Sequence, residues 1–310
     1  MKLTAYILLF ITTLYGVTFD EATDNFNKKN YIEAYDQYSQ LALDDDANAQ
    51  YNIALMNYKG IGVSKNNKLA FFWYEKSALN GNSAAQNNLA HMYFLGEEVK
   101  KDLVLAEKWY KLSAEANYPL AQLNLAMMYD SSTNEEKVKE AFTWYTKASL
   151  QGVIIAQNNL AKMYYMGRGT KTDKEQALYW FTKAADASNP VAQANLAMMY
   201  LSADSVPKDI EKAIVLFTKS AEQNNLASMI RLADLYGKGN ETSLNYEKSF
   251  YWYEKAAALN STSAIYHLGL YYYHGYGVPK DVDKGIKYIR EAKDKGYKRA
   301  ENFFKLNNIR

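Results

Sequence analysis

The chain contains no cysteine, and only four of its 310 residues are proline. Without cysteine it cannot form disulfides, thiolate metal sites or iron–sulfur clusters, or use a thiol nucleophile. The scarcity of proline permits long uninterrupted helices. Neither sign of charge dominates, since 36 basic side chains stand against 34 acidic ones. Because nucleic acids and anionic membrane surfaces require a basic face, we expect neither as a partner.

Residues typical of enzymatic chemistry are also few. The only histidines are His91, His267 and His274. The last two are seven residues apart, about 10 Å along a helix, which is too far for them to share a metal ion directly. The sequence has no phosphate-binding loop, dinucleotide fingerprint or nucleophile elbow. It therefore predicts no catalytic residue, no metal site and no cofactor.

Two short segments have a chemical interpretation beside a simpler one. Ser205-Val206-Pro207-Lys208 matches the Ser-x-x-Lys motif of penicillin-recognising enzymes, but Pro207 disrupts the helical turn that the motif needs, and its partner motifs are missing. Asp44-Asp45-Asp46 can be a cation site or a set of carboxylates placed before a helix N-terminus. We favour a chance match for the first and the helix N-terminus for the second, because carboxylates there complement the helix dipole.

The N-terminal segment has the order of a secretory signal. Lys2 is followed by an uncharged, mostly apolar stretch over residues 3–19, and acidic residues come next. This order predicts a signal peptide over residues 1–18, with cleavage after Gly16 or Thr18. An uncleaved anchor is the alternative, disfavoured because the stretch is short and rich in threonine. We expect a periplasmic or secreted protein whose mature chain has no integral membrane segment.

An internal repeat of 35 or 36 residues dominates the rest of the chain. Apolar residues follow its first small residue at offsets 4, 7 and 8, which share one face of an α-helix, here called helix A. Each repeat opens on one of the residues Ala49, Ala85, Ala121, Ala156, Ala192, Ser228 and Ala264, and Ala300 continues the series.

A second helix, helix B, is predicted further along each repeat. Its apolar stripe is centred on Trp73, Trp109, Trp144, Trp180, Leu216, Trp252 and Tyr288. The A–B connections are short and often contain glycine, which can end a helix in the left-handed conformation. The connections at 130–132 and 202–204 lack glycine, and a site-specific departure can be sought there. Predicted N-caps of helix B are Asn66, Asp102, Asp173, Asp209, Asn245 and Asp281.

A single helix pair cannot bury its apolar stripe, so neighbouring pairs must stack. The predicted fold class is therefore all-α, a solenoid of about seven 36-residue helix-pair repeats. We expect a partial or capping helix pair over residues 19–45, seven repeats over 46–297 and a C-terminal capping helix over 298–310.

The repeated pattern Ala-Gln-x-Asn-Leu-Ala-x-Met-Tyr, Gly-x-Gly-Val and Ala-x-x-Trp-Tyr-x-Lys-Ala-Ala resembles the Sel-1-like repeat, a relative of the tetratricopeptide repeat. The resemblance implies a right-handed superhelix that acts as an adaptor or scaffold for protein or peptide partners, often exported from bacteria. One cysteine-rich branch of that family is described as penicillin-binding with weak β-lactamase activity, and this chain departs from it. We expect a non-enzymatic exported scaffold; a β-lactamase-like protein and a structural subunit of an envelope complex are the alternatives.

Helix A has a second face, at offsets −1, +3, +6 and +10, which we call the A face. Offset +3 forms an asparagine ladder that ends at Arg231 and His267. Amides can hydrogen-bond a peptide backbone and methionine adapts to varied side chains, so the A face can bind an extended peptide. Alternatively, these residues join neighbouring helices. The candidate groove residues are Asn88, Asn124, Asn159, Asn195, Leu120, Ile155, Val191, Met127, Met166 and Met198.

Overall fold

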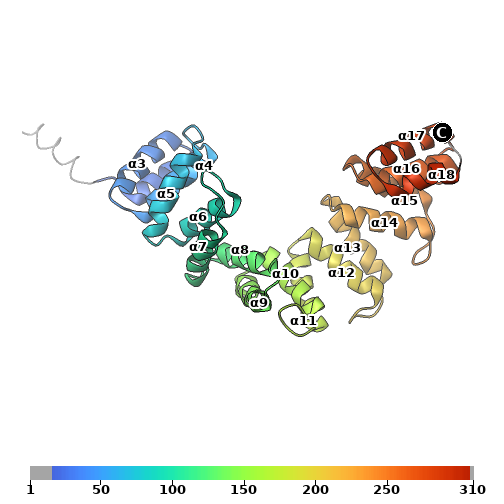
Figure 1. The fold of residues 1–310 in the computed structure, drawn as a ribbon, viewed down its shortest axis with the longest axis horizontal. Helices are drawn as coiled ribbons and strands as arrows, with labels where there is room; N and C mark the ends of the chain where they lie inside the picture. The colour runs from blue at the N-terminus through green and yellow to red at the C-terminus, as the bar shows by residue number, and fades with distance from the viewer. Residues whose placement is uncertain (1–15, 308–310) are drawn as a thin grey trace, which may run out of the picture. The chain divides into compact units, whose positions relative to one another are not determined.

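The computed structural model describes residues 16–307, and all regular secondary structure in that range is α-helical (Figure 1). The all-α prediction is therefore confirmed. Contacts divide the chain into two compact units, residues 1–153 and 154–310. Most of the predicted signal peptide lies outside the described residues.

The described part of the N-terminal unit contains eight helices. Each packs on the next along the chain. The helices are α2 (Phe19–Asn27), α3 (Tyr31–Leu43), α4 (Ala47–Lys59), α5 (Asn67–Leu79), α6 (Ser83–Leu95), α7 (Leu103–Glu115), α8 (Pro119–Asp130) and α9 (Glu135–Leu150).

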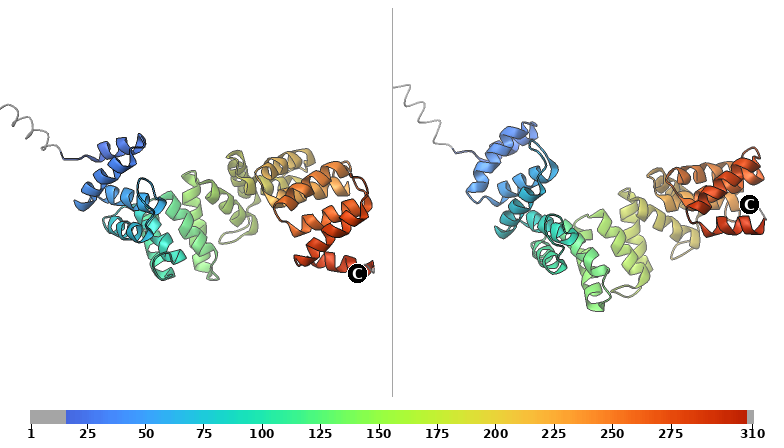
Figure 2. Two further views of the ribbon diagram at one scale, coloured as in Figure 1. Left: turned by 90° about the horizontal axis from the view of Figure 1, so that it is seen from above. Right: turned by 45° about the horizontal axis from the view of Figure 1, so that its top comes forward.

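The C-terminal unit follows the same scheme, and two further views show its paired helices (Figure 2). Its helices are α10 (Ile154–Met166), α11 (Lys174–Asp186), α12 (Pro190–Ser202), α13 (Ile210–Glu222), α14 (Leu226–Lys238), α15 (Tyr246–Ala258), α16 (Thr262–His274), α17 (Val282–Asp294) and α18 (Lys298–Leu306).

The even-numbered helices α4 to α16 are the predicted A helices, and the odd-numbered helices α5 to α17 are the predicted B helices. The apolar A stripe is buried: Leu89, Leu125, Leu160 and Leu232 are wholly inaccessible to solvent. Burying one such side chain stabilises the fold by about 1.5–3 kcal/mol. The small residues of both helices lie in these contacts, where they let two backbones approach.

The approach of backbones is closest between α16 and α17. Gly269 and Gly285 stand there in columns that hold alanine or serine in the other repeats. A Cβ added to Gly285 would lie 2.7 Å from the backbone nitrogen of Tyr273 and 2.8 Å from the carbonyl oxygen of Gly269. Neither position has room for a side chain.

The predicted N-caps of helix B are confirmed. In each case the side chain accepts a hydrogen bond from a backbone N–H in the first helical turn, which satisfies a donor that has no partner within the helix. The capping residues are Asn66, Asp102, Asp173, Asp209, Asn245 and Asp281.

The two connections without glycine are accommodated differently. Ala203 ends α12 with a left-handed φ of +56°, a conformation that glycine supplies in other repeats, as at Gly60 and Gly96. Ser131 ends α8 in the right-handed conformation instead, and α9 begins early, at Glu135, and reaches 16 residues. In both places the helix pair is retained.

Buried glutamines tie four of the A helices, α4, α6, α8 and α12, to the end of the helix before them. The glutamine one position after the opening small residue donates from Nε2 to a carbonyl group eight residues earlier, near the C-terminus of the preceding helix. These bonds run from Gln50, Gln86, Gln122 and Gln193 to Ala42, Ala78, Ala114 and Ala185, at 3.1–3.3 Å. The glutamine of the repeat pattern is therefore a structural residue.

Candidate functional site

The predicted apolar residues of the A face are solvent-exposed. In the N-terminal unit, Leu120 and Met127 of α8 are 48% and 49% exposed. In the C-terminal unit, Ile155, Val191 and Met166 are about half exposed or more, and Met198 somewhat less. Exposed apolar groups on one face of successive helices are a feature of interaction surfaces.

The asparagine ladder links neighbouring A helices. Asn124 donates from Nδ2 to Oδ1 of Asn87 at 2.9 Å, and Asn87 donates in turn to Oδ1 of Asn88 at 3.1 Å. The C-terminal unit repeats the arrangement. There the bonds run from Asn195 to Asn158 and from Asn158 to Asn159, at 3.1 and 3.2 Å. These contacts favour the structural interpretation of the ladder.

We expect Asn124→Ala and Asn195→Ala each to lower the free energy of unfolding by about 1 kcal/mol, because each removes one partly buried inter-repeat hydrogen bond. Thermal melting followed by circular dichroism measures the effect. An unchanged melting temperature in both variants would contradict the structural role and favour the alternative that the amides bind a ligand.

A cavity lies where the asparagine ladder ends. It measures about 370 Å³ and is bordered by α14, α15, α16 and α18. Four of its residues, Ser263, His267, Leu270 and His274, are the A-face positions of α16. We call this cavity the tyrosine pocket, because its wall also contains Tyr246, Tyr253, Tyr271 and Tyr276.

The wall of the tyrosine pocket departs from the repeat pattern at two positions. Gly237 occupies a column that in most other repeats holds a large side chain, such as Tyr165 or Tyr273. The phenol of Tyr271, which replaces the methionine of earlier repeats, takes up the freed space: a Cβ on Gly237 would lie 2.5 Å from its oxygen. That hydroxyl also hydrogen-bonds Ser249 at 2.5 Å. The sequence pattern identified the end of the asparagine ladder, but it did not predict that Tyr271 fills the space left by Gly237.

The charges around the tyrosine pocket are unequally paired. Tyr253 donates its hydroxyl to Oδ1 of Asp234 at 2.6 Å, and Lys238 Nζ lies 3.5 Å from the other oxygen. Burial, together with this hydrogen bond, raises the pKa of Tyr253 far above its usual range. His267 stacks on the Tyr253 ring with centroids 4.6 Å apart. Burial lowers the pKa of His267. The cations Arg299 and Lys238 lower this pKa further, whereas the carboxylate of Asp234 acts in the opposite direction.

This environment makes stability depend on pH. The unfolded chain protonates His267 below about pH 6.5, whereas the folded chain does so only at lower pH. The unfolded state therefore binds more protons between the two pKa values, so stability falls as the pH drops through about 6.5. We expect His267→Asn, which restores the ladder residue, to reduce this loss in urea titrations at pH 7.5 and 5.5. His274→Asn, at an exposed position in the same helix, is the matched control and should retain the wild-type loss.

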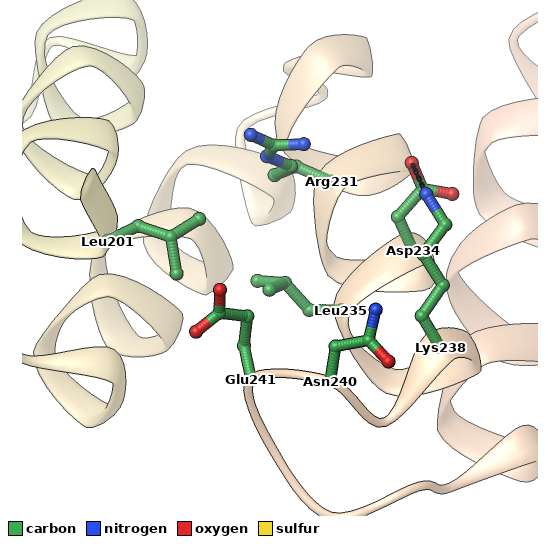
Figure 3. A pocket seen from close by; sticks show the side chains of 7 residues that line it. All are labelled: Leu201, Arg231, Asp234, Leu235, Lys238, Asn240 and Glu241. Carbon is green, nitrogen blue, oxygen red and sulfur yellow. Dashed lines mark ion pairs between the residues drawn. The ribbon is translucent and has the colours of Figure 1, made fainter.

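A smaller cavity of about 150 Å³ also borders α14 and shares Asp234 and Lys238 with the tyrosine pocket (Figure 3). Leu201 of α12 faces Arg231 and Leu235 across it, and the loop residues Asn240 and Glu241 close one end. Nε of Arg231 is buried without a hydrogen-bond partner, and its Nη2 lies 3.5 Å from Sδ of Met198. This guanidinium therefore joins the A faces of α12 and α14.

The segments with alternative chemical interpretations have structural roles. Ser205 and Lys208 both precede α13, Ser205 has a left-handed φ of +64°, and Lys208 forms a 2.6 Å ion pair with Glu241. They do not share the helical turn that a serine–lysine pair needs. Asp46 is the N-cap of α4 and accepts a hydrogen bond from the backbone N–H of Ala49 at 2.8 Å.

Neither metal ligation nor membrane insertion is indicated in residues 16–307. No three His, Asp or Glu side chains converge there in a way that could hold a metal ion. None of the helices formed by these residues combines the length and apolar content needed to cross a bilayer. His91, in the N-terminal unit, instead hydrogen-bonds the hydroxyl of Tyr110 through Nδ1 at 3.2 Å.

Stacked helix pairs that expose apolar side chains on one face are typical of the class of helical repeat scaffolds. The family model of the Sel1 repeat matches seven consecutive segments, and the chain belongs to the Sel1 repeat family. The segments are 47–82, 83–118, 119–153, 154–189, 190–225, 226–261 and 262–297. The resemblance to Sel-1-like repeats is thus confirmed.

Two solved structures are similar over most of the chain. A Sel1 repeat protein from Oxalobacter formigenes is 25% identical, with a TM-score of 0.73, and the match covers 92% of this chain and 86% of that one. A protective antigen of uropathogenic Escherichia coli with the same repeat fold is 28% identical, with a TM-score of 0.64 over 87% of this chain. The chain spans 66% of that antigen, just under two thirds of its length. No curated protein is similar enough to match.

Proposed function

We propose that this protein is a scaffold that binds an extended segment of a protein partner along the A face of its C-terminal unit. Sel1 repeat proteins generally act as protein-interaction scaffolds, and stacked repeats present long continuous surfaces. The observation that carries the proposal is the combination, on one face of α10 to α16, of exposed apolar side chains with the tyrosine pocket.

The side chains of this face suit an extended ligand. Val191 and Met198 lie two turns apart on α12, and both are exposed. Methionine can adapt its shape to different side chains, which suits a surface without a single rigid pocket. The tyrosine pocket, on the A face of α16, supplies the concave, partly aromatic site in which one side chain of the segment can be anchored.

Two valines of the C-terminal unit allow a controlled test. Val191 lies on the A face and is 46% exposed, whereas Val215 lies on a B helix, α13, and is 52% exposed. Because both are exposed, aspartate at either position should leave the fold intact. We expect Val191→Asp to lose partners captured from an extract of the source cells, and Val215→Asp to retain them.

Quantitative mass spectrometry of the captured proteins provides the measurement, with circular dichroism to confirm folding. Equal capture by both variants would exclude the A face as the binding surface. Equal loss in both would indicate a different surface that includes α13.

We also propose that the chain is exported and that the signal peptide is cleaved after Gly16. The N-terminal apolar stretch supports export, and one similar structure is described as a protective antigen. Thr18 and Glu21 form a reciprocal capping box at the start of α2, with hydrogen bonds of 3.2 and 3.0 Å. Cleavage after Thr18 would remove this cap, so we expect N-terminal sequencing of the secreted or periplasmic protein to begin at Val17. An intact Met1 in cytosolic protein would contradict export.

A further inference from the structure

Three residues that can donate hydrogen bonds line the tyrosine pocket. Ser263 and His267 lie one turn apart on α16, and Arg299 comes from α18, the next helix along the A face. All three line the cavity. They occupy the A-face offsets −1, +3 and −1 of their helices, so the group continues the face on which the proposed function rests.

The tyrosine pocket has two cationic side chains, Lys238 and Arg299, and only one of them forms an ion pair with a carboxylate. Lys238 pairs with Asp234, which also accepts the Tyr253 hydroxyl, so this carboxylate is already engaged from two sides. Arg299 forms no ion pair with any carboxylate of residues 16–307. The pocket therefore has one guanidinium that forms no direct ion pair with a carboxylate of the described residues. A guanidinium can bind a carboxylate through two parallel hydrogen bonds.

The arginine is also unusual in this chain, which has five arginines among its 36 basic residues. Two of the five, Arg231 and Arg299, are on the A face of the C-terminal unit, and both are found where the asparagine ladder has ended. Repeats that keep the ladder hold asparagine or an apolar residue at the corresponding positions, such as Asn195 and Val191. The change from amides to cations alters the ligand that this end of the face can accept.

We propose that the tyrosine pocket binds an acidic side chain, aspartate or glutamate, of the partner's extended segment. Arg299 supplies the compensating charge, and His267 can donate a further hydrogen bond to the same carboxylate. The Ser263 hydroxyl, which lies 3.3 Å from the hydroxyl of Tyr297, can donate another while accepting from that tyrosine. The rings of Tyr253 and Tyr271 contact the apolar part of that side chain. A cavity of about 370 Å³ is large enough for such an anchor residue with its adjoining backbone.

Selection from a displayed peptide library tests this proposal directly. The library consists of random ten-residue peptides with blocked C-termini, and the bait is the full mature protein. We expect peptides with aspartate or glutamate to be enriched by the wild-type protein. Arg299→Gln should weaken binding of a selected acidic peptide about fivefold or more, as measured by fluorescence anisotropy, and should reduce the salt dependence of binding. Arg299 is exposed, so its replacement should leave the fold intact.

Arg290→Gln is the matched control, since Arg290 belongs to α17 and contacts the Phe304 ring outside the pocket. It should leave acidic-peptide binding unchanged. Selection of peptides without acidic enrichment would overturn the carboxylate pocket while leaving segment binding intact. Binding only to peptides with a free C-terminus would show that the bound carboxylate is the C-terminal one and not that of a side chain, and this would overturn the proposal. If neither format selects any peptide, both this proposal and the proposed function are contradicted.

Discussion

Replacing Gly277 with alanine is expected to lower the free energy of unfolding of the C-terminal unit by about 3 kcal/mol. Gly277 has a left-handed φ of +65°, which costs an alanine about 1–2 kcal/mol. Its Cβ would also lie 2.6 Å from the carbonyl carbon of Tyr246 and 2.8 Å from the backbone nitrogen of Glu247. Because the obstacle is backbone at the start of α15, no side-chain rotation can relieve it.

Gly296 provides the matched control. It also has a left-handed φ, +84°, but no heavy atom lies within 4 Å of the position that a Cβ would take. Gly296→Ala should therefore cost only the conformational term, about 1 kcal/mol. Urea unfolding of both variants, followed by circular dichroism and tryptophan fluorescence, measures the difference. Equal destabilisation would mean that the loop around Gly277 moves freely away from α15.

The same substitution should affect the tyrosine pocket. Tyr246 and Tyr276 stack with ring centroids 4.7 Å apart, and both line the pocket. Gly277 follows Tyr276 directly and contacts the backbone of Tyr246, so a displaced loop would separate the two rings. Under conditions where Gly277→Ala remains folded, we expect weaker binding of acidic peptides than with Gly296→Ala.

The second large effect is expected on α8, whose two faces have different roles. Leu125 is wholly buried, so Leu125→Ala should destabilise the N-terminal unit by about 3 kcal/mol, from lost burial and the cavity left behind. Met127, two residues later, is 49% exposed. Met127→Ala should change stability by less than about 0.5 kcal/mol.

Thermal melting of the two variants provides the measurement. The difference in stability loss between the two variants distinguishes the buried apolar stripe, which stabilises the fold, from the exposed A face beside it. A loss of stability in Met127→Ala comparable to that in Leu125→Ala would show that the exposed methionine also supports packing, and would remove α8 from the candidate surface.

Much of the fold could be predicted because the repeat makes it redundant. The small or apolar residues at offsets 0, 4 and 7 recur in every copy, and offset 8 departs only in the first, at Asn57. A position that deviates in one repeat can therefore be interpreted from the other repeats. The N-caps of helix B were predicted for the same reason: Asp or Asn recurs just before the second stripe and acts locally, on backbone groups two or three residues away.

The candidate site could be predicted only in part. The sequence defined the A face by its helical offsets, and it showed that the asparagine ladder ends at Arg231 and His267. It left open whether the amides bind a ligand or each other, because Asn124 and Asn87 are 37 residues apart and their hydrogen bond depends on how two helices stack.

The sequence by itself therefore determined the all-α repeat, its helix pairs and their caps, since these follow from periodicity and from interactions between near neighbours in the chain. The tertiary structure alone decided where a cavity forms. The missing side chain at Gly237 is filled by the phenol of Tyr271, which belongs to the next repeat, and Ser249 of the intervening helix fixes its hydroxyl. Space released in one repeat is occupied by a side chain of another, and only the packing of α14, α15 and α16 shows how much of it remains open beside His267 and Arg299.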